Sequence, residues 1–150
     1  MGTLALPTSG SVYLDANCFI YSVEKIEPYN TLLKPMWVAA KANQFEIVSS
    51  ELTLLETLTK PLQDDDTMLE NIFRALLNAN EVRLIPTTTA IWEQATRFRA
   101  KTGLKTPDAI HAATALVASC TLFITNDVVF RRVSSLSVTI LSDFIEQSNT

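Results

Sequence analysis

The stretch Thr106-Pro-Asp-Ala-Ile-His-Ala-Ala-Thr-Ala-Leu-Val-Ala-Ser-Cys-Thr-Leu-Phe-Ile-Thr125 contains a helix followed directly by a strand. Proline suits the first turn of a helix, so we expect the helix to begin at Thr106 or Pro107 and to reach about Ala118. The apolar and β-branched run 121–125 predicts a buried strand. A helix that leads at once into such a strand is the repeating unit of parallel α/β sheets.

The same alternation continues on both sides of this stretch. Five short strands are predicted, at Ser11–Leu14, Glu46–Val48, Val82–Ile85, Thr121–Thr125 and Ser137–Leu141. Apolar residues at helical spacing predict further helices over Tyr29 to about Ala42, Ser49 or Ser50 to about Thr59, Asp64–Asp66 to Leu77, and Thr87–Thr89 to at least Phe98. Pro61 is expected to end or bend the second of these. The predicted fold is therefore α/β: one domain over residues 1–150, with a core at about 11–143 and a mostly parallel five-stranded central sheet that has helices on both faces.

Composition limits the class of protein. The chain has 150 residues, 47% hydrophobic and 19% charged, with a net charge of −4, which is typical of one globular domain and not of a polycation that coats nucleic acid. Its two cysteines, Cys18 and Cys120, are interpreted as small core residues in a reducing compartment. We see no signal peptide and no apolar run of membrane-spanning length, so we expect a cytoplasmic protein without a membrane partner.

Four acidic residues are expected to meet at one edge of the sheet. Asp15 follows the first strand and Asp127 follows the fourth, so both lie at the carboxyl edge. Asp108 lies in the first turn of the helix before the fourth strand; that helix rises roughly 18 Å, and the strand returns over about the same length. Glu56 lies one to two turns into the helix after the second strand. Ligand sites of open α/β sheets form at this edge.

Converging carboxylates repel one another, and a divalent cation removes the conflict. Ligands that are all oxygen favour Mg²⁺ or Mn²⁺ over Zn²⁺. A metal site of this kind can polarise a phosphodiester, lower the pKa of a bound water and stabilise the leaving oxygen. The alternative is four unrelated surface acids at helix ends, which a chain with sixteen Asp and Glu residues could supply. Spacing alone does not decide between the two.

Four segments resemble, in order, the motifs of the PIN-domain nucleases, and most closely those of the VapC-type toxins of bacterial toxin–antitoxin pairs. The segments are Val12-Tyr-Leu-Asp-Ala-Asn17, Ser49-Ser-Glu-Leu-Thr-Leu-Leu-Glu56, Thr106-Pro-Asp-Ala-Ile-His-Ala-Ala-Thr-Ala115 and Thr125-Asn-Asp-Val-Val-Phe130. The resemblance runs from about residue 11 to residue 143. The third segment, with its lead-in Thr-Gly-Leu-Lys at 102–105, is highly specific, whereas the first is weak by itself.

The resemblance implies a function and a set of site residues. Its metal-binding and catalytic acids match Asp15, Glu56, Asp108 and Asp127. Asn17 matches a polar residue that orients the site, and Thr125 matches a hydroxyl two residues before the last acid. Members of the family cleave single-stranded or looped RNA, often tRNA or ribosomal RNA, with Mg²⁺ or Mn²⁺. Many form homodimers and are silenced by an antitoxin protein. By this resemblance the chain is predicted to be a metal-dependent endoribonuclease toxin.

Two residues close to the proposed ligands leave alternatives open. Glu51 lies on the same predicted helix as Glu56, but the two point about 140° apart and cannot both aim at one ion. Leucines flank both, so only the motif register favours Glu56. His111 lies three residues after Asp108 and therefore on the same helical face. It could bind metal, act as a base, hold a carboxylate or pack, and we favour packing or support of the ligands over direct catalysis.

Basic residues are concentrated in one part of the chain. Residues 97–132 contain six basic and two acidic residues, a net charge of +4, which leaves −8 for the rest. This stretch brackets two proposed ligands, as an RNA-binding rim would, with Arg97, Lys101 and Arg131 as its candidates. Solvated helix ends are the alternative. The acidic run Asp64–Asp66 is interpreted as a stabilised helix start and not as a metal site.

Two other functions are compatible with an acid after the first strand. An aspartate-dependent phosphotransferase would need a second acid two residues after Asp15, where the chain has Asn17, and a lysine in a later motif. A noncatalytic PIN-like module that binds RNA or protein would not need all four acids. Both alternatives therefore rank below the nuclease.

Overall fold

The computed structural model describes residues 2–145, and its centre is a five-stranded sheet in the order β3-β2-β1-β4-β5. Every neighbouring pair is parallel. The strands are β1 (Ser11–Leu14), β2 (Glu46–Ser50), β3 (Val82–Ile85), β4 (Leu122–Thr125) and β5 (Val138–Ile140). The predicted α/β fold is confirmed, with a sheet that is entirely parallel in this order.

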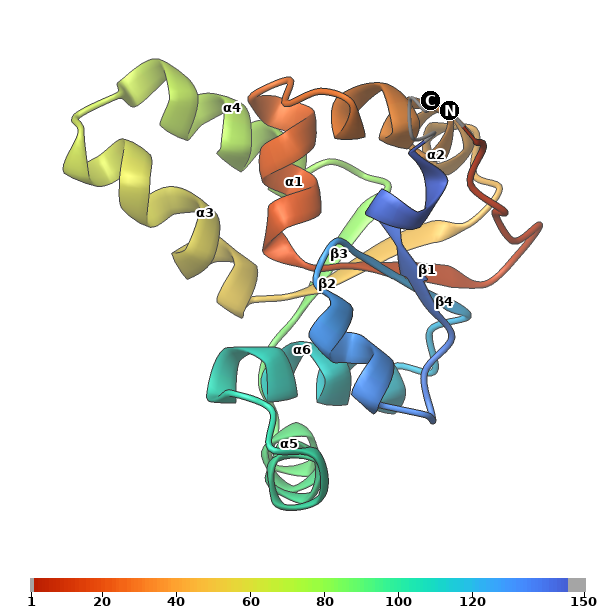
Figure 1. The fold of residues 1–150 in the computed structure, drawn as a ribbon. Coiled ribbons are helices and arrows are strands. Elements are labelled where there is room, and N and C mark those ends of the chain that lie inside the picture. The colour runs from red at the N-terminus through yellow and green to blue at the C-terminus, as the bar shows by residue number, and fades with distance from the viewer. Residues whose placement is uncertain (1, 146–150) are drawn as a thin grey trace, which may run out of the picture.

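Helices connect the strands. The α-helices are α1 (Ala16–Val23), α2 (Tyr29–Lys41), α3 (Leu52–Gln63), α4 (Thr67–Leu77), α5 (Thr89–Thr102) and α6 (Thr106–Val117), and two 3₁₀ helices are η1 (Val128–Arg132) and η2 (Leu141–Phe144). In Figure 1, α1 and α2 lie above the sheet, α5 and α6 lie below it, and the α3–α4 hairpin projects to one side. Helices cover both faces, as predicted. None of the helices within residues 2–145 is long and apolar enough to cross a membrane.

Alternate residues of the strands divide the core into two clusters. Val12, Leu14 and Ile124 face α1, α2 and α4, where Phe19, Leu33 and Met36 among others pack on them. Tyr13 and Phe123 face the other way, toward α5 and α6. Because successive strand residues point to opposite faces, Asp15 continues the row of Tyr13, and Thr125 continues that of Phe123. The two polar residues therefore point toward the α6 side of the sheet.

The connection order fixes where a ligand pocket can form. From β1 the chain proceeds to β2 and β3 on one side of the sheet, whereas β4 and β5 lie on the other side. The order reverses between β1 and β4, and open parallel sheets bind ligands outside the carboxyl ends of strands at such a point. Asp15 directly follows β1, and Asp127 lies two residues after β4.

Some local predictions were wrong. Helix α1 was not predicted, and neither was η1 or η2. The second predicted helix begins at Leu52, two residues late, because β2 continues to Ser50, and it passes Pro61 to end at Gln63. Strand β4 begins one residue later than predicted, and β5 is one residue shorter at each end.

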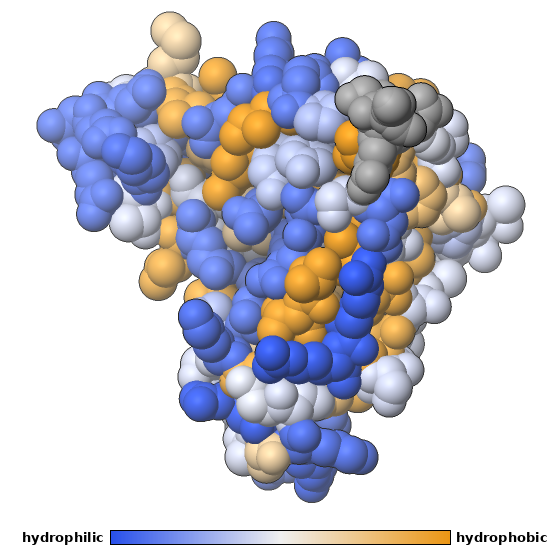
Figure 2. Space-filling model, viewed as in Figure 1, coloured by the Kyte–Doolittle hydropathy of each residue, from blue (hydrophilic) through white to orange (hydrophobic). Residues whose placement is uncertain are grey.

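The acidic run Asp64–Asp66 forms the turn between α3 and α4, as its helix-start interpretation implies. The Asp66 carboxylate accepts a hydrogen bond from the Leu69 amide at 3.0 Å and caps α4. Asp64 pairs with Lys60 at 2.8 Å. This tip of the hairpin is strongly hydrophilic on the face shown in Figure 2.

Candidate active site

All four predicted acids line one open cavity of about 400 Å³ at the carboxyl edge of the sheet. Asp15 directly follows β1, and Asp127 directly precedes η1. Glu56 lies on α3, and Asp108 lies in the first turn of α6. Asn17 and His111 line the same cavity, together with Ala16, Ile20, Leu55 and Thr59. Glu51 is exposed at the start of α3 and does not line it. The structure therefore places Glu56, and not Glu51, beside the other acids.

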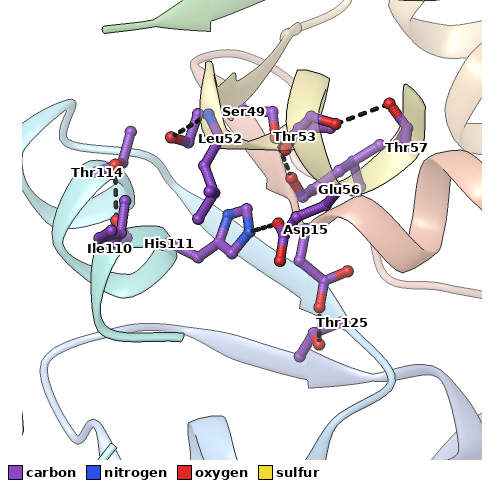
Figure 3. Close-up of polar contacts among 12 residues, drawn as sticks. Asp15, Ser49, Leu52, Thr53, Glu56, Thr57, Ile110, His111, Thr114 and Thr125 are labelled. Carbon is purple, nitrogen blue, oxygen red and sulfur yellow. Dashed lines mark hydrogen bonds and ion pairs between the residues drawn. The ribbon is translucent and has the colours of Figure 1, made fainter. Parts of the chain in front are cut away.

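Asp15 is the most buried of the four acids, with 6% of its surface exposed. The Thr125 hydroxyl donates a hydrogen bond of 2.5 Å to one carboxylate oxygen (Figure 3). The same hydroxyl accepts a hydrogen bond from the Asp127 amide at 3.1 Å. The other oxygen, Oδ1, is buried without a hydrogen-bond partner within residues 2–145. Burial raises the pKa of Asp15, against the opposite effects of Thr125 and His111. A buried carboxylate oxygen without a donor is a position that a cation, a water molecule or a proton can satisfy.

Glu56 is held by His111. The imidazole Nε2 lies 2.6 Å from Oε1 of Glu56, and this contact joins α6 to α3 across the pocket (Figure 3). His111 is 2% exposed, whereas the Glu56 side chain is 28% exposed, so the ring lies behind the carboxylate. The prediction of packing or support for His111 matches this placement. The outward end of Glu56 remains available to a ligand in the pocket.

Tyr13 lies behind His111 and was missed in the sequence. Its hydroxyl is 2.6 Å from Nδ1 of the imidazole, and its side chain is completely buried. Burial raises the pKa of Tyr13 well above its usual range. Strand alternation was a signal that could have found it, because Tyr13 is two residues before Asp15 and so faces the same side.

Asp108 and Asp127 form the remaining part of the acidic wall. Burial raises the pKa of Asp108, and the nearby Asp127 carboxylate raises it further, followed by Asp15 and Glu56, while His111 lowers it. Asp127 is exposed, and its Oδ1 accepts the Val129 amide at 3.0 Å at the start of η1. The three other carboxylates of the pocket thus all raise the pKa of Asp108.

Asn17 lies in the first turn of α1 and is exposed to the pocket. Asp15 is the N-cap residue of this helix, but its side chain makes no capping hydrogen bond. Its carboxylate is held by Thr125 and lines the pocket. Asn17 adds an amide oxygen, which is also a hard ligand.

The basic residues lie outside the pocket lining. Arg97 is exposed on α5, and Lys101 lines a separate cavity of about 350 Å³ with Arg132. Arg131 forms an ion pair with Asp143. The structure thus does not bring Arg97, Lys101 or Arg131 into contact with the acids. Of the three, Arg131 already has an acidic partner.

The donor set of the pocket fits a hard divalent cation. Its polar groups are four carboxylates, the Asn17 amide, the Thr59 hydroxyl and the His111 imidazole, so oxygen ligands predominate. Within residues 2–145 no hydrogen-bond donor competes for Asp15 Oδ1. As the side chains stand, no three carboxylate, imidazole or thiol groups within residues 2–145 converge closely enough to hold one ion. Mg²⁺ commonly uses one or two carboxylates and completes its shell with water and substrate phosphates. The residues present therefore suffice for such an ion.

The fold and the pocket define the chain as a single-domain, parallel α/β protein with an acidic ligand site at the switch point of its sheet. Residues 12–136 match the model of the PIN domain, so the chain belongs to the PIN-domain family. The resemblance drawn from the four sequence segments is confirmed at the level of the family. No curated protein matches the chain significantly in sequence.

Solved structures with the same fold include three from toxin–antitoxin systems. VapBC2 from Rickettsia felis, bound to a DNA fragment from its promoter, has a TM-score of 0.69 and 16% identity, covering 87% of this chain and 98% of that one. VapBC-1 from nontypeable Haemophilus influenzae has a TM-score of 0.66 and 20% identity, with coverage of 88% and 98%. VapC20 from Mycobacterium tuberculosis, a toxin that cleaves the sarcin–ricin loop, has a TM-score of 0.67 and 16% identity, with coverage of 82% and 95%. These identities establish a shared fold.

Proposed function

We propose that this protein is a metal-dependent endoribonuclease, the VapC-type toxin of a toxin–antitoxin pair. The observation that carries the proposal is the pocket where four carboxylates from four parts of the chain meet, with one buried carboxylate oxygen left without a partner among residues 2–145. A merely structural pocket has no need of three carboxylates that together raise the pKa of a fourth, Asp108. Membership of the PIN-domain family supports the same conclusion.

In this proposal Asp15, Glu56, Asp108 and Asp127 hold Mg²⁺ or Mn²⁺, and Asn17 orients the site. A bound divalent ion would supply Lewis acidity and a water of lowered pKa at the scissile phosphodiester. The protein's own part is to fix the ligands: Thr125 holds Asp15, and His111 holds Glu56. The clustered negative charge also confines productive RNA binding to a complex in which a cation screens the phosphate from the carboxylates.

The proposed substrate is single-stranded or looped RNA of the tRNA or ribosomal RNA class. The M. tuberculosis toxin VapC20, which shares the fold, cleaves the sarcin–ricin loop, and this supports a looped RNA as the substrate here. Because the pocket lining itself is acidic, phosphates away from the cleavage site need a basic surface. Arg97 and Lys101 on α5 are the candidates, and Arg131 is the weaker one because Asp143 already neutralises it.

The proposed protein partners are a cognate antitoxin and a second copy of the chain. Several structural neighbours are toxin–antitoxin complexes, including those from R. felis and H. influenzae. The chain exposes large apolar side chains on the α3–α4 hairpin, which a partner could cover: Leu55, Leu62, Met68 and Ile72. Co-expression with the neighbouring reading frame, followed by co-purification and mass measurement of the complex, tests both partners.

The deciding experiment is RNA cleavage by the purified protein. Total RNA and a labelled single-stranded RNA are incubated with Mg²⁺, Mn²⁺ or EDTA, beside Asp15→Asn and Asp108→Asn. Asp143→Asn serves as a control, because this carboxylate is paired with Arg131 and does not line the pocket. We expect cleavage by the wild type and the control that needs the ion and is lost in the two pocket variants. Equal cleavage by all four proteins would reject the nuclease, and phosphorylation of Asp15 by a phosphate donor would favour the phosphotransferase.

A further inference from the structure

Tyr13 lies one layer below the pocket and is not among the residues that line it. Its ring is fixed from two directions. It stacks on Phe123, with the ring centroids 5.0 Å apart and the planes at 9°, and β1 holds its backbone between β2 and β4. A ring held in this way aims its hydroxyl at a fixed point, and that point is Nδ1 of His111 at 2.6 Å.

The hydrogen bonds on the two sides of His111 define which nitrogen carries the proton. An ionised carboxylate can only accept, so Nε2 must donate to Glu56. A neutral imidazole has a single N–H, so Nδ1 must then accept, and the Tyr13 hydroxyl must donate to it. This arrangement gives each of the three groups a hydrogen-bond partner.

We propose that Tyr13 is a positioning residue, which fixes the His111 ring as its Nε2–H tautomer and thereby holds the Glu56 carboxylate in the pocket. The inference rests on the proposed function only in taking Glu56 as a ligand of the cation. Outer partners that fix the tautomer and orientation of an imidazole typically change metal affinity or activity by about 10–100-fold when removed. Here the effect passes through one further link, from the phenol to the imidazole to the carboxylate.

The chain is suited to a direct test because His111 is its only histidine. The metal-free wild type is compared with Tyr13→Phe, which keeps the ring stacked on Phe123 and removes only the hydroxyl. Tyr29→Phe is the matched control, since that ring packs on Tyr21, with centroids 4.7 Å apart. Imidazole ¹⁵N NMR at neutral pH reads the protonation of each ring nitrogen without any dependence on RNA or metal.

We expect the wild type and Tyr29→Phe to show the Nε2–H tautomer, with Nδ1 as the acceptor, and Tyr13→Phe to show a mixture of tautomers or a proton on Nδ1. A wild-type ring protonated on Nδ1, or on both nitrogens, would overturn the proposal even if the variants failed to fold. A Tyr13→Phe spectrum identical to that of the wild type would do the same.

A second measurement tests the link from the imidazole to Glu56. Mn²⁺ binding is measured by calorimetry for the wild type, Tyr13→Phe, Glu56→Gln and the double variant. We expect Tyr13→Phe to weaken Mn²⁺ binding about 10-fold and to add no further loss once Glu56 is replaced. The positioning role is rejected if Tyr13→Phe binds Mn²⁺ as well as the wild type does. It is also rejected if Tyr13→Phe still weakens binding about 10-fold when Glu56 has already been replaced by Gln. If the wild type binds no Mn²⁺, the proposed metal-dependent function is rejected. The proposed role of Tyr13 in positioning Glu56 as a metal ligand is then rejected as well.

Discussion

The two sides of the acidic pocket are built differently. On one side, which we name the held side, the Asp15 and Glu56 carboxylates each accept a hydrogen bond from a buried group, Thr125 for the first and His111 for the second. On the other side, the repelling side, Asp108 and Asp127 line the same cavity, and burial together with this neighbouring carboxylate raises the pKa of Asp108. One side thus has its geometry fixed by hydrogen bonds, whereas the other stores charge repulsion that a cation relieves.

The difference indicates how the pocket is divided between structure and binding. A carboxylate that is held in advance loses little entropy when it binds an ion, so the held side would set the position of the proposed ion. The repelling side would contribute attraction, because an acid such as Asp108, whose pKa is raised by burial and by a neighbouring carboxylate, gains most from a positive charge. Substitutions in the pocket should therefore reduce or abolish RNA cleavage, whereas substitutions outside it should cause only small changes in RNA binding.

The largest effect is expected from Asp15→Asn on the held side. Loss of the most buried proposed ligand should reduce cleavage by at least about 100-fold. This is more than the loss that is typical when a residue that only supports a metal ligand is removed. Without metal, the same variant should melt at a higher temperature than the wild type at pH 7. Burial raises the pKa of Asp15 above its value in the unfolded chain, so ionisation of the folded protein costs stability at neutral pH.

The sign of this stability effect can be checked by pH. Stability linked to a raised pKa is fully present below the unfolded value and is lost as the pH rises through the folded value. The gap in melting temperature between Asp15→Asn and the wild type should therefore shrink as the medium is acidified. If Asp15→Asn melts below the wild type at neutral pH, Asp15 stabilises the metal-free fold. That result would contradict the destabilising effect expected from its raised pKa.

A smaller loss is expected from Glu56→Gln, which keeps the shape of the side chain but removes its charge. Cleavage should fall about 10–100-fold, with a corresponding rise in the Mn²⁺ concentration needed for half-maximal rate. Glu51→Gln is the matched control on the same helix, since Glu51 is exposed and lies outside the pocket. Equal losses in the two variants would remove Glu56 from the held side.

Thr125→Val tests the hydroxyl that joins the two sides. The Thr125 hydroxyl donates to Asp15 and accepts the Asp127 amide, so its removal should lower activity by about 10-fold, and Thr125→Ser should restore most of it. Thr114→Val is a control of equal burial, because the Thr114 hydroxyl bonds only to the Ile110 carbonyl of its own helix. The measurement is the cleavage rate at saturating Mn²⁺. Equal rates in Thr125→Val and Thr114→Val would deny Thr125 its role.

The smallest effects are expected outside the pocket. Arg97→Gln and Lys101→Gln should weaken RNA binding a few-fold and reduce the slope of log affinity against log salt by about 0.7 for each phosphate contact with single-stranded RNA. Arg131→Gln should change less, since Asp143 already pairs with that guanidinium. Fluorescence anisotropy with the inactive Asp15→Asn protein measures binding without cleavage. If Arg131→Gln weakens RNA binding more than Arg97→Gln and Lys101→Gln do, RNA binds along η1 and not along α5.

Three of the four pocket acids could be placed from the sequence because parallel strands end at one edge. Asp15 and Asp127 follow strands, and Asp108 opens the helix that precedes one of them. Glu56 could not be separated from Glu51 by periodicity, since leucines flank both. The rotation of α3 that turns Glu56 into the pocket depends on the packing of that helix against the rest of the fold, which the local pattern does not contain.

Other features depended on contacts far away in the sequence. Helix α1 has only eight residues, rich in aromatic and β-branched types, so local propensity did not predict it. It forms because Cys18 and Phe19 are buried in the core that it shares with α2. The role of Tyr13 likewise depends on His111, 98 residues later in the chain. Secondary-structure propensity depends on the residues of one segment. These features depend on contacts between two segments that are far apart in the sequence.

The Thr125–Asp15 hydrogen bond spans 110 residues of sequence and joins the first strand to the fourth. A chain still being made on the ribosome cannot form it until β4 has left the exit tunnel and inserted beside β1. Any truncated product that stops before residue 122 lacks both Thr125 and Asp127. If the pocket cleaves RNA, its full set of acids is therefore assembled only after the chain has been made and folded through β4 and Asp127.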